Sequence, residues 1–163
     1  MLPHIVAEAA DRFGERAVLV DHRGLELTYA ELHRRSDRAA AAFADAGLGI
    51  GSVVALAIGS TFDYLVAYVA AAKIGAITAG INPSLAAAEQ SALIERLGPD
   101  LVIDGPVPER PGSVAVLPDD PERIVAVVFT SDTTGPPKGA VYRSRQLAAL
   151  CEAGDATDYV TYL

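Results

Sequence analysis

The residues of this sequence with the clearest capacity for chemistry lie in one stretch, Thr-Ser-Asp-Thr-Thr-Gly-Pro-Pro-Lys-Gly, at positions 130–139. It combines several hydroxyl groups and backbone N–H donors with one ammonium group, that of Lys138. Its adjacent prolines fix φ and remove hydrogen-bond donors, which predicts a stiff loop instead of a continued strand. Gly135 and Gly139 permit backbone conformations that other residues avoid. Such a loop suits a polyphosphate, since it offers donors for the oxygens and a cation for the charge.

The stretch follows Ile124–Phe129, an apolar run rich in β-branched residues that predicts a buried strand. Two common phosphate motifs do not fit the loop. A Walker A loop requires Gly-Lys-Ser/Thr, whereas Lys138 follows Pro137 and precedes Gly139. The dinucleotide fingerprint G-x-G-x-x-G is absent from this stretch. The alternative interpretation is a hydroxyl-rich surface turn after a buried strand.

The loop resembles the phosphate loop of the AMP-forming acyl- and aryl-CoA synthetases. That superfamily also includes firefly luciferase and the adenylation domains of peptide synthetases, and its pattern is Thr-Ser-Gly-Thr-Thr-Gly-x-Pro-Lys-Gly. The matching positions are Thr130, Ser131, Thr133, Thr134, Gly135, Pro137, Lys138 and Gly139. The sequence departs from the pattern at Asp132, where the family has glycine.

Four upstream segments follow the same synthetases in order and spacing: Leu27-Thr-Tyr-Ala-Glu-Leu32, Gly51-Ser-Val-Val-Ala-Leu56, Ala72-Lys-Ile-Gly-Ala76 and Ile81-Asn-Pro83. The last is more similar to acyl-CoA synthetases than to peptide-synthetase adenylation domains, in which the corresponding stretch usually reads Leu-Asp-Pro. A second departure is Arg143-Ser144, where the family often has Thr-His. The resemblance covers about Thr28 to Leu147.

The resemblance implies an ATP-dependent acid–thiol ligase that activates a fatty or other carboxylic acid as an acyl-adenylate and transfers it to CoA. ATP, Mg²⁺ and CoA are the cofactors implied, and Lys138 is the expected catalytic residue, a mobile cation. No protein metal ligands are expected. The nucleotide phosphates would be bound by Thr130, Ser131, Asp132, Thr133, Thr134, Gly135, Lys138 and Gly139.

Residues 1–163 are expected to form the N-terminal part of an AMP-binding domain that ends shortly after the phosphate loop, with the C-terminal domain absent. The alternative is a non-catalytic truncated fragment or pseudo-enzyme that folds and self-associates, for example as a homodimer. In either case the carboxylic acid and CoA are expected to be partners of the full-length enzyme only. The chain alone would make no acyl-adenylate.

The phosphate loop is expected at the end of a strand in a layered αβα fold with a largely parallel sheet, since strands and helices alternate along the chain. The expected helices are Ile5–Phe13, Tyr29–Ala46, a helix from Ser60 or Thr61 to Lys73, and Leu85–Leu97. The expected strands are Ala17–Asp21, Leu25–Thr28, Val53–Ile58, Ala76–Ile81, Leu101–Ile103, Val114–Leu117 and Ile124–Phe129. Thr28 is expected to cap the helix that follows it, with Glu31 three residues later.

Composition narrows the function further. A formal net charge of −8 without a basic block argues against nucleic acid or an anionic membrane surface as a partner. A single cysteine, Cys151, cannot form an internal disulfide, which indicates a reducing, cytoplasmic setting. The apolar stretch Leu65–Ile81 contains Lys73 and Gly75, which favours a helix and a strand over a membrane span. The three histidines are expected to be isolated residues at the surface: His4, His22 and His33.

Overall fold

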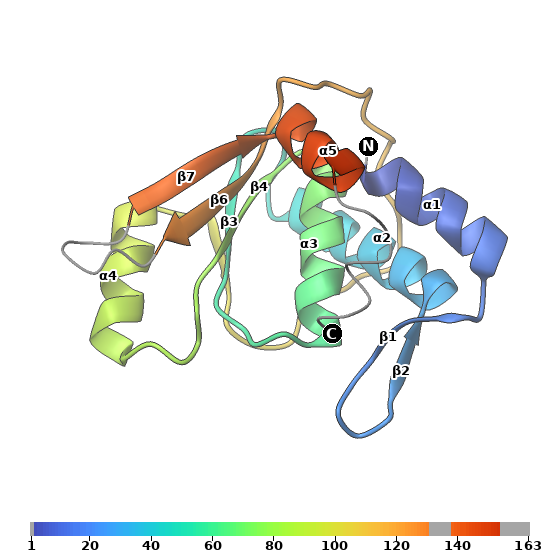
Figure 1. The fold of residues 1–163 in the computed structure, drawn as a ribbon, viewed down its shortest axis with the longest axis horizontal. Helices are drawn as coiled ribbons and strands as arrows, with labels where there is room; N and C mark the ends of the chain where they lie inside the picture. The colour runs from blue at the N-terminus through green and yellow to red at the C-terminus, as the bar shows by residue number, and fades with distance from the viewer. Residues whose placement is uncertain (1, 131–137, 154–163) are drawn as a thin grey trace.

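A central sheet of five strands, in the order β5-β3-β4-β6-β7, organises the computed structural model, which describes residues 2–130 and 138–153 (Figure 1). The strands β3, β4, β5 and β6 are mutually parallel, and β7 pairs antiparallel with β6. The strands are β1 Ala17–Val20, β2 Glu26–Thr28, β3 Val53–Leu56, β4 Ile77–Gly80, β5 Leu101–Ile103, β6 Ile124–Thr130 and β7 Lys138–Arg143. The helices are α1 Leu2–Phe13, α2 Tyr29–Asp45, α3 Phe62–Ile74, α4 Ala87–Leu97 and α5 Ser144–Ala153.

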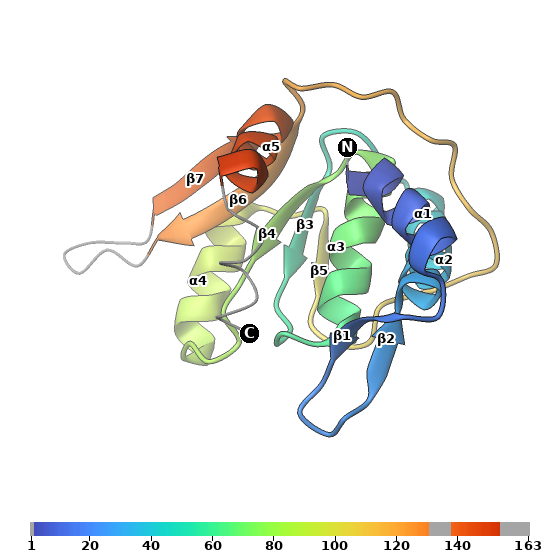
Figure 2. The same ribbon diagram turned by 45° about the vertical axis from the view of Figure 1, so that its right-hand side comes forward.

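Helices cover both faces of the sheet, which confirms the predicted layered αβα fold (Figures 1 and 2). On one face, Val54 and Leu56 of β3 pack in a core cluster with residues of α1, α2 and α3. On the other face, Ala55 packs with Leu93 of α4. Successive residues of a strand point to opposite faces, so β3 is apolar throughout because it is covered on both sides.

The helices of the larger cluster approach closely because small side chains line their contact. Ala39 and Ala40 of α2 and Ala67, Ala70 and Ala71 of α3 are almost completely buried. Alanine has no long side chain to keep two helix axes apart, so the alanine content of the sequence serves this packing. The most voluminous fully buried side chain is Phe43 of α2.

The predicted helix boundaries agree with the observed caps. The Thr28 hydroxyl accepts a hydrogen bond from the Glu31 N–H at 3.1 Å, and Thr61 caps α3 through the Tyr64 N–H at 3.3 Å. Gly75 ends α3 with φ +73°, a left-handed conformation that favours glycine. No described helix is long and apolar enough to cross a membrane, and Leu65–Ile81 forms the end of a helix followed by a strand.

Two buried or half-buried polar clusters join elements that are far apart in sequence. Lys73 has a side chain only 6% exposed, and its Nζ lies 2.6 Å from Asp37 Oδ1 and 3.1 Å from the His33 carbonyl oxygen. His33 Nδ1 also lies 3.3 Å from that ammonium, so the prediction that this histidine is isolated was wrong. The cluster links α2 to α3.

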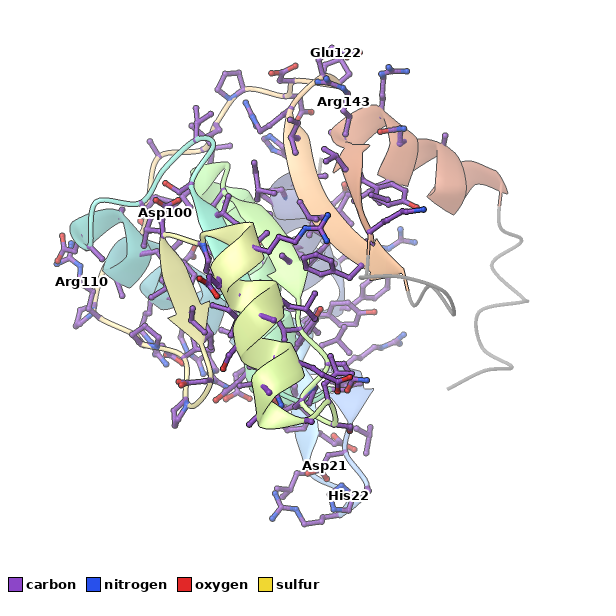
Figure 3. The ribbon with its side chains drawn as sticks, turned by 90° about the vertical axis from the view of Figure 1, so that its left-hand side faces the viewer. Asp21, His22, Asp100, Arg110, Glu122 and Arg143 are labelled. Atoms are coloured by element: carbon purple, nitrogen blue, oxygen red, sulfur yellow. The ribbon has the colours of Figure 1, made fainter. Side chains whose placement is uncertain are left out.

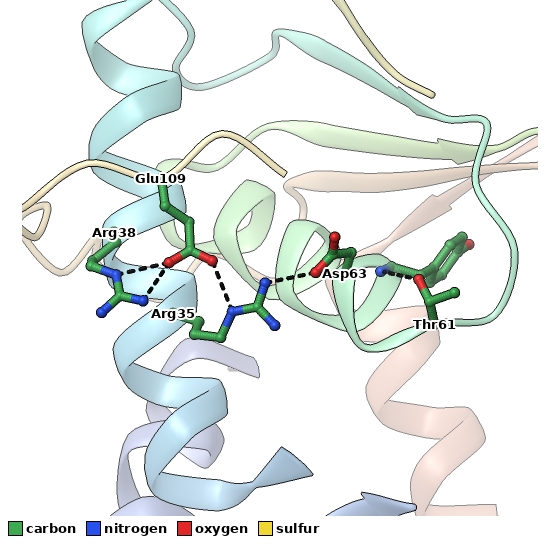
Figure 4. A network of polar contacts seen from close by, with 6 residues as sticks. Arg35, Arg38, Thr61, Asp63 and Glu109 are labelled. Carbon is green, nitrogen blue, oxygen red and sulfur yellow. Dashed lines mark hydrogen bonds and ion pairs between the residues drawn. The ribbon is translucent and has the colours of Figure 1, made fainter. Parts of the chain in front are cut away.

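The second cluster connects the long segment between β5 and β6 to α2 and α3 (Figure 4). Glu109 accepts hydrogen bonds from Arg35 Nε and Arg38 Nε, each at 2.8 Å. Arg35 Nη2 also reaches Asp63 Oδ1 at 2.6 Å. Arg35 is therefore part of a network that joins α2, α3 and the segment between β5 and β6.

One predicted strand is wrong, and one observed strand was not predicted. Residues Val114–Leu117 form no strand; Val114 packs against the larger core cluster from an extended segment. Conversely, Lys138–Arg143 forms the edge strand β7, which was not predicted. The stretch Tyr159–Leu163, whose sequence Tyr-Val-Thr-Tyr-Leu predicts the start of another strand, lies outside the described residues.

Candidate functional site

The carboxyl ends of three parallel strands define one edge of the sheet, and the predicted phosphate loop begins there. β3 ends at Leu56, β4 at Gly80 and β6 at Thr130. β7 returns from the same edge, since Thr130 is opposite Lys138 in the β6–β7 register. Ligands of open α/β sheets bind outside the carboxyl ends of the strands. The two ends of the predicted loop are therefore held where such a sheet binds ligands.

The structure places three of the predicted phosphate-binding residues. Thr130 ends β6, Lys138 begins β7 with an exposed side chain, and Gly139 lies opposite Phe129. Five others lie outside the described residues: Ser131, Asp132, Thr133, Thr134 and Gly135.

The structure gives a different reason for glycine at position 139 from the one expected. It does not appear among the glycines with positive φ, so unusual backbone freedom is not what the position requires. A Cβ added at Gly139 would lie 3.0 Å from Cγ1 of Val127 and 3.5 Å from the ring of Phe129. The absence of a side chain lets these two residues of β6 pack over β7. Gly139 thus shapes the hairpin that presents the loop.

A cleft lies beside the carboxyl ends of β3 and β4, two neighbouring strands from which the chain continues toward opposite faces of the sheet. β3 leads into α3 on one face and β4 leads into α4 on the other (Figure 1). Such a switch point leaves a crevice between the two connections. The cleft here has a volume of about 440 Å³ and is lined by Ile58, Gly59, Ser60, Tyr64, Gly80, Ile81, Asn82, Pro83 and Ser84.

Local hydrogen bonds preorganise one wall of this cleft. The Asn82 side-chain oxygen accepts from the Ser84 N–H at 2.9 Å, and the Leu85 N–H donates to the Asn82 carbonyl at 3.2 Å. The Gln90 side chain of α4 donates to the carbonyls of Pro83 and Leu85 at 3.2 and 2.8 Å. An Asx turn tied to a helix keeps the wall in one conformation. In the sequence, Asn82-Pro83 after an apolar run indicates a turn and gives no sign of the cleft.

The described residues that line the cleft are polar or apolar and carry no charge. They include the hydroxyl-bearing residues Ser60, Tyr64 and Ser84, together with the partly buried Ile58. Positive charge near this edge comes from Lys138 at the start of β7. Within residues 2–130 and 138–153, no three His, Cys, Asp or Glu side chains are grouped so as to hold a metal ion. These described residues therefore supply a cation and neutral donors, which suit phosphate oxygens and a neutral ligand group.

Comparison with known proteins gives a family and a fold. A family model described as AMP-binding enzyme matches residues 6–117. The chain is 32% identical to 4-chlorobenzoate–CoA ligase of Arthrobacter sp, over 88% of this chain and 33% of that protein. It is 28% identical to phosphinothricin tripeptide synthetase PhsB of Streptomyces viridochromogenes, over 86% of this chain and 14% of that protein.

Among solved structures, the Mycobacterium tuberculosis fatty acyl CoA synthetase superimposes with a TM-score of 0.77 at 22% identity, covering 90% of this chain and 35% of that one. The N-terminal subdomain of Klebsiella oxytoca NpsA, in complex with 3-hydroxybenzoyl-AMSN, gives a TM-score of 0.76 at 22% identity, covering 91% and 42%. This likeness concerns the fold. The chain spans less than half the length of each of these four proteins.

Proposed function

From the membership of this chain in the AMP-binding enzyme family, we propose that it supplies the phosphate-binding part of an ATP-dependent acid–thiol ligase. The observation that carries the proposal is the pairing of Thr130 with Lys138, which anchors both ends of the loop at the carboxyl edge of the sheet. The neighbouring switch-point cleft supports it, because a ligand bound at the loop would have room beside its phosphates.

The reaction has two steps. A carboxylate oxygen of the acid attacks the α-phosphorus of ATP; the bond from that phosphorus to the bridging oxygen breaks, and pyrophosphate leaves. The thiol then loses its proton to solvent, its sulfur attacks the acyl carbon, and AMP leaves with the electrons of the broken C–O bond. Both steps move negative charge onto phosphate oxygens, so a fixed field of donors and a cation lowers their barriers.

The proposed roles follow the loop. Thr130, Ser131, Thr133 and Thr134 donate hydroxyl hydrogen bonds to the β- and γ-phosphates, and Gly135 lets the backbone approach them. Lys138 follows the departing pyrophosphate charge with its flexible ammonium. Mg²⁺ would supply further neutralisation of the phosphate charge.

The acyl acceptor is proposed to be CoA, although relatives of two kinds match the chain. One is a CoA ligase and another is a peptide synthetase. The ligase proposal is favoured by the stretch Ile81-Asn-Pro83, which resembles acyl-CoA synthetases more than peptide-synthetase adenylation domains. A fatty or other carboxylic acid is the proposed substrate class.

A second candidate function is binding without turnover. The observation that favours it is coverage, because the chain spans 33% of the CoA ligase that it matches. On this proposal the chain binds polyphosphate at the loop but needs residues corresponding to the remainder of the relatives for adenylation.

Competition binding tests the proposal. Mg²⁺–ATP and pyrophosphate should compete for one site on the chain, while AMP, which lacks the β- and γ-phosphates, should compete far more weakly. Binding of AMP as tight as that of ATP would contradict a phosphate loop. Acid-dependent release of pyrophosphate, measured with a panel of fatty and aromatic acids, separates the two functions. Release by this chain would exclude binding without turnover.

A further inference from the structure

The cleft at the switch point is lined by Tyr64, whose hydroxyl group has no hydrogen-bond partner among the described residues. Tyr64 lies in the first turn of α3, and its ring packs against the larger core cluster. Its hydroxyl forms no hydrogen bond with any residue in the described part of the chain, whereas its backbone N–H is bound by Thr61. The ring is thus held by packing, and its hydroxyl lies beside Gly80, which also lines the cleft. Burial raises the pKa of Tyr64, so the hydroxyl keeps its proton at neutral pH and can donate it to a ligand.

Gly80 provides the space for this hydroxyl. A Cβ built at Gly80 would lie 3.0 Å from Tyr64 Oη, closer than carbon and oxygen normally approach. Gly80 is not among the glycines with positive φ, so backbone conformation does not require glycine there. The missing side chain instead admits the phenol to the carboxyl end of β4. Tyr64 and Gly80, sixteen residues apart in sequence, therefore form one feature.

The register of the sheet places this feature near the phosphate loop. Ala79 of β4 pairs with Val127 of β6, so Gly80 stands beside Val128, two residues before Thr130. Strand spacing of about 4.8 Å and a rise of about 3.3 Å per residue put the Cα atoms of Gly80 and Thr130 about 8 Å apart. A ligand of ordinary size can therefore span both places.

We propose that Tyr64 is a specificity-determining residue whose hydroxyl donates a hydrogen bond to an uncharged oxygen acceptor, such as an amide carbonyl, on a ligand that also reaches the phosphate loop. The described residues of the lining carry no charged side chain, so they offer no counter-ion for a carboxylate or phosphate group. Ser60 and Ser84 add neutral hydroxyl groups near Ile58, which suits an amide group flanked by methylene groups. The inference rests on the proposed function for the end of the ligand that reaches the phosphate loop. The oxygen acceptor can belong either to the acid or to the thiol.

Ligand-observed and protein-observed NMR with small probes tests the proposal on the chain as it exists. N-acetylcysteamine represents an amide on the thiol, N-acetyl-β-alanine an amide on the acid, and hexanoate an acid without an amide. At least one amide probe should bind at the cleft, and Tyr64→Phe should weaken its binding about fivefold, as expected for one lost hydrogen bond. The matched control is Tyr68→Phe, the same change one turn later on α3, outside the cleft lining, which should leave binding unchanged.

A second pair of variants separates the hydroxyl from the fold. Gly80→Ala should lower both the melting temperature and probe binding, because the new Cβ meets the phenol oxygen. The double variant Tyr64→Phe/Gly80→Ala should recover the melting temperature, since the oxygen is gone, but not probe binding. Recovery of binding in the double variant would overturn the role of the hydroxyl.

Three further results would overturn the proposal: no amide probe binds the wild-type chain, Tyr64→Phe binds as well as wild type, or Tyr68→Phe weakens binding as much as Tyr64→Phe. Hexanoate binding with the same Tyr64 dependence would overturn the assignment to a neutral acceptor. The thiol and acid probes identify the source of the amide. Pyrophosphate binding, measured in the same samples, reports on the phosphate loop alone. If the wild-type chain bound an amide probe but no pyrophosphate, the proposed function would be contradicted and the Tyr64 site would still be supported.

Discussion

Glu109→Gln should destabilise the fold by removing the charge at the centre of the network in Figure 4. The carboxylate accepts from Arg35 Nε and Arg38 Nε, each at 2.8 Å, and thereby fastens the segment between β5 and β6 to α2. Glutamine retains one carbonyl oxygen but replaces the other oxygen with an NH₂ group. That group would face the donors of one arginine, so at least one contact is lost.

The magnitude follows from partial burial. The side chains of Glu109 and Arg35 are 20% and 19% exposed. Hydrogen bonds to charged groups contribute about 1.5–3 kcal/mol when buried, whereas exposed ion pairs contribute about 0.2–1 kcal/mol. For this intermediate exposure we expect a loss of about 2 kcal/mol in the free energy of unfolding. A domain of this size loses about 2–4 °C per kcal/mol, so the melting temperature should fall by about 4–8 °C.

Urea and thermal unfolding followed by circular dichroism measure this loss against a matched variant, Glu122→Gln. Glu122 lies in the same segment and also faces two arginines, with Oε1 at 2.7 Å from Arg145 Nε and Oε2 at 3.7 Å from Arg143 Nε. It lies with Arg143 near the end of the hairpin remote from the phosphate loop (Figure 3), and its side chain is 60% exposed. Its change should cost no more than about 0.5 kcal/mol. Equal destabilisation by the two variants would refute the reasoning from burial.

The same network predicts a pH dependence. Burial alone would raise the pKa of Glu109, but hydrogen bonds from Arg35 and Arg38 outweigh it and hold the pKa below its usual 4.5. Between the folded and unfolded pKa values the unfolded chain binds more protons, so stability rises with pH there. The contribution of Glu109 is present above about pH 4.5 and is lost as pH falls through its folded-state pKa. The stability difference between wild type and Glu109→Gln should therefore shrink in acid.

Three further changes have defined outcomes. Lys73→Met should cost about 1–3 kcal/mol in unfolding free energy, because it leaves Asp37 without the ammonium that lies 2.6 Å from its Oδ1. Val141→Lys should weaken the self-association expected at edge strand β7, where Val141 is 53% exposed, as measured by sedimentation equilibrium. Asp132→Gly should tighten ATP binding severalfold by removing about 1 kcal/mol of charge repulsion, measured by calorimetry across Mg²⁺ concentrations; this prediction comes from sequence, since Asp132 lies outside the described residues.

Each of these outcomes can fail in its own way. A double-mutant cycle of Lys73→Met with Asp37→Asn that shows no coupling would contradict the ion pair between α2 and α3. A monodisperse monomer at high wild-type concentration would exclude association through β7. Equal or weaker ATP affinity in Asp132→Gly at every Mg²⁺ concentration would exclude repulsion by that carboxylate.

The fold was predictable where local chemistry decides it. Apolar runs bounded by glycine and proline indicated β3, β4 and β6, because strands buried on both faces are continuously apolar. Thr28 marked one helix start, and Ser60 or Thr61 another, because a hydroxyl satisfies an otherwise unpaired N–H. The end of β6 was indicated by the glycine and the prolines that follow its β-branched run; the phosphate-binding role of the loop stays a prediction.

The remainder depends on contacts between residues far apart in sequence. The first half of β7 is largely exposed, and β7 is stabilised as a strand by its pairing with β6. Its residue pattern alone therefore did not predict a strand. Val114–Leu117 has strand-like residues but packs on the core without joining the sheet. The Tyr64 hydroxyl lies beside Gly80 because α3 packs over β4. Local periodicity carries no information about such placements.

The most direct test of the phosphate site is calorimetric titration of Mg²⁺–ATP into wild type, Lys138→Ala and Arg145→Ala. Arg145 is a matched cation in α5, beyond the opposite end of β7, and its ion pair with Glu122 is exposed. We expect Lys138→Ala to weaken ATP binding about tenfold or more, equivalent to about 1.4 kcal/mol, as for one charge-assisted contact. Arg145→Ala should bind as wild type. Absence of ATP binding to wild type, or equal affinity in Lys138→Ala, would contradict the assignment of the phosphate loop.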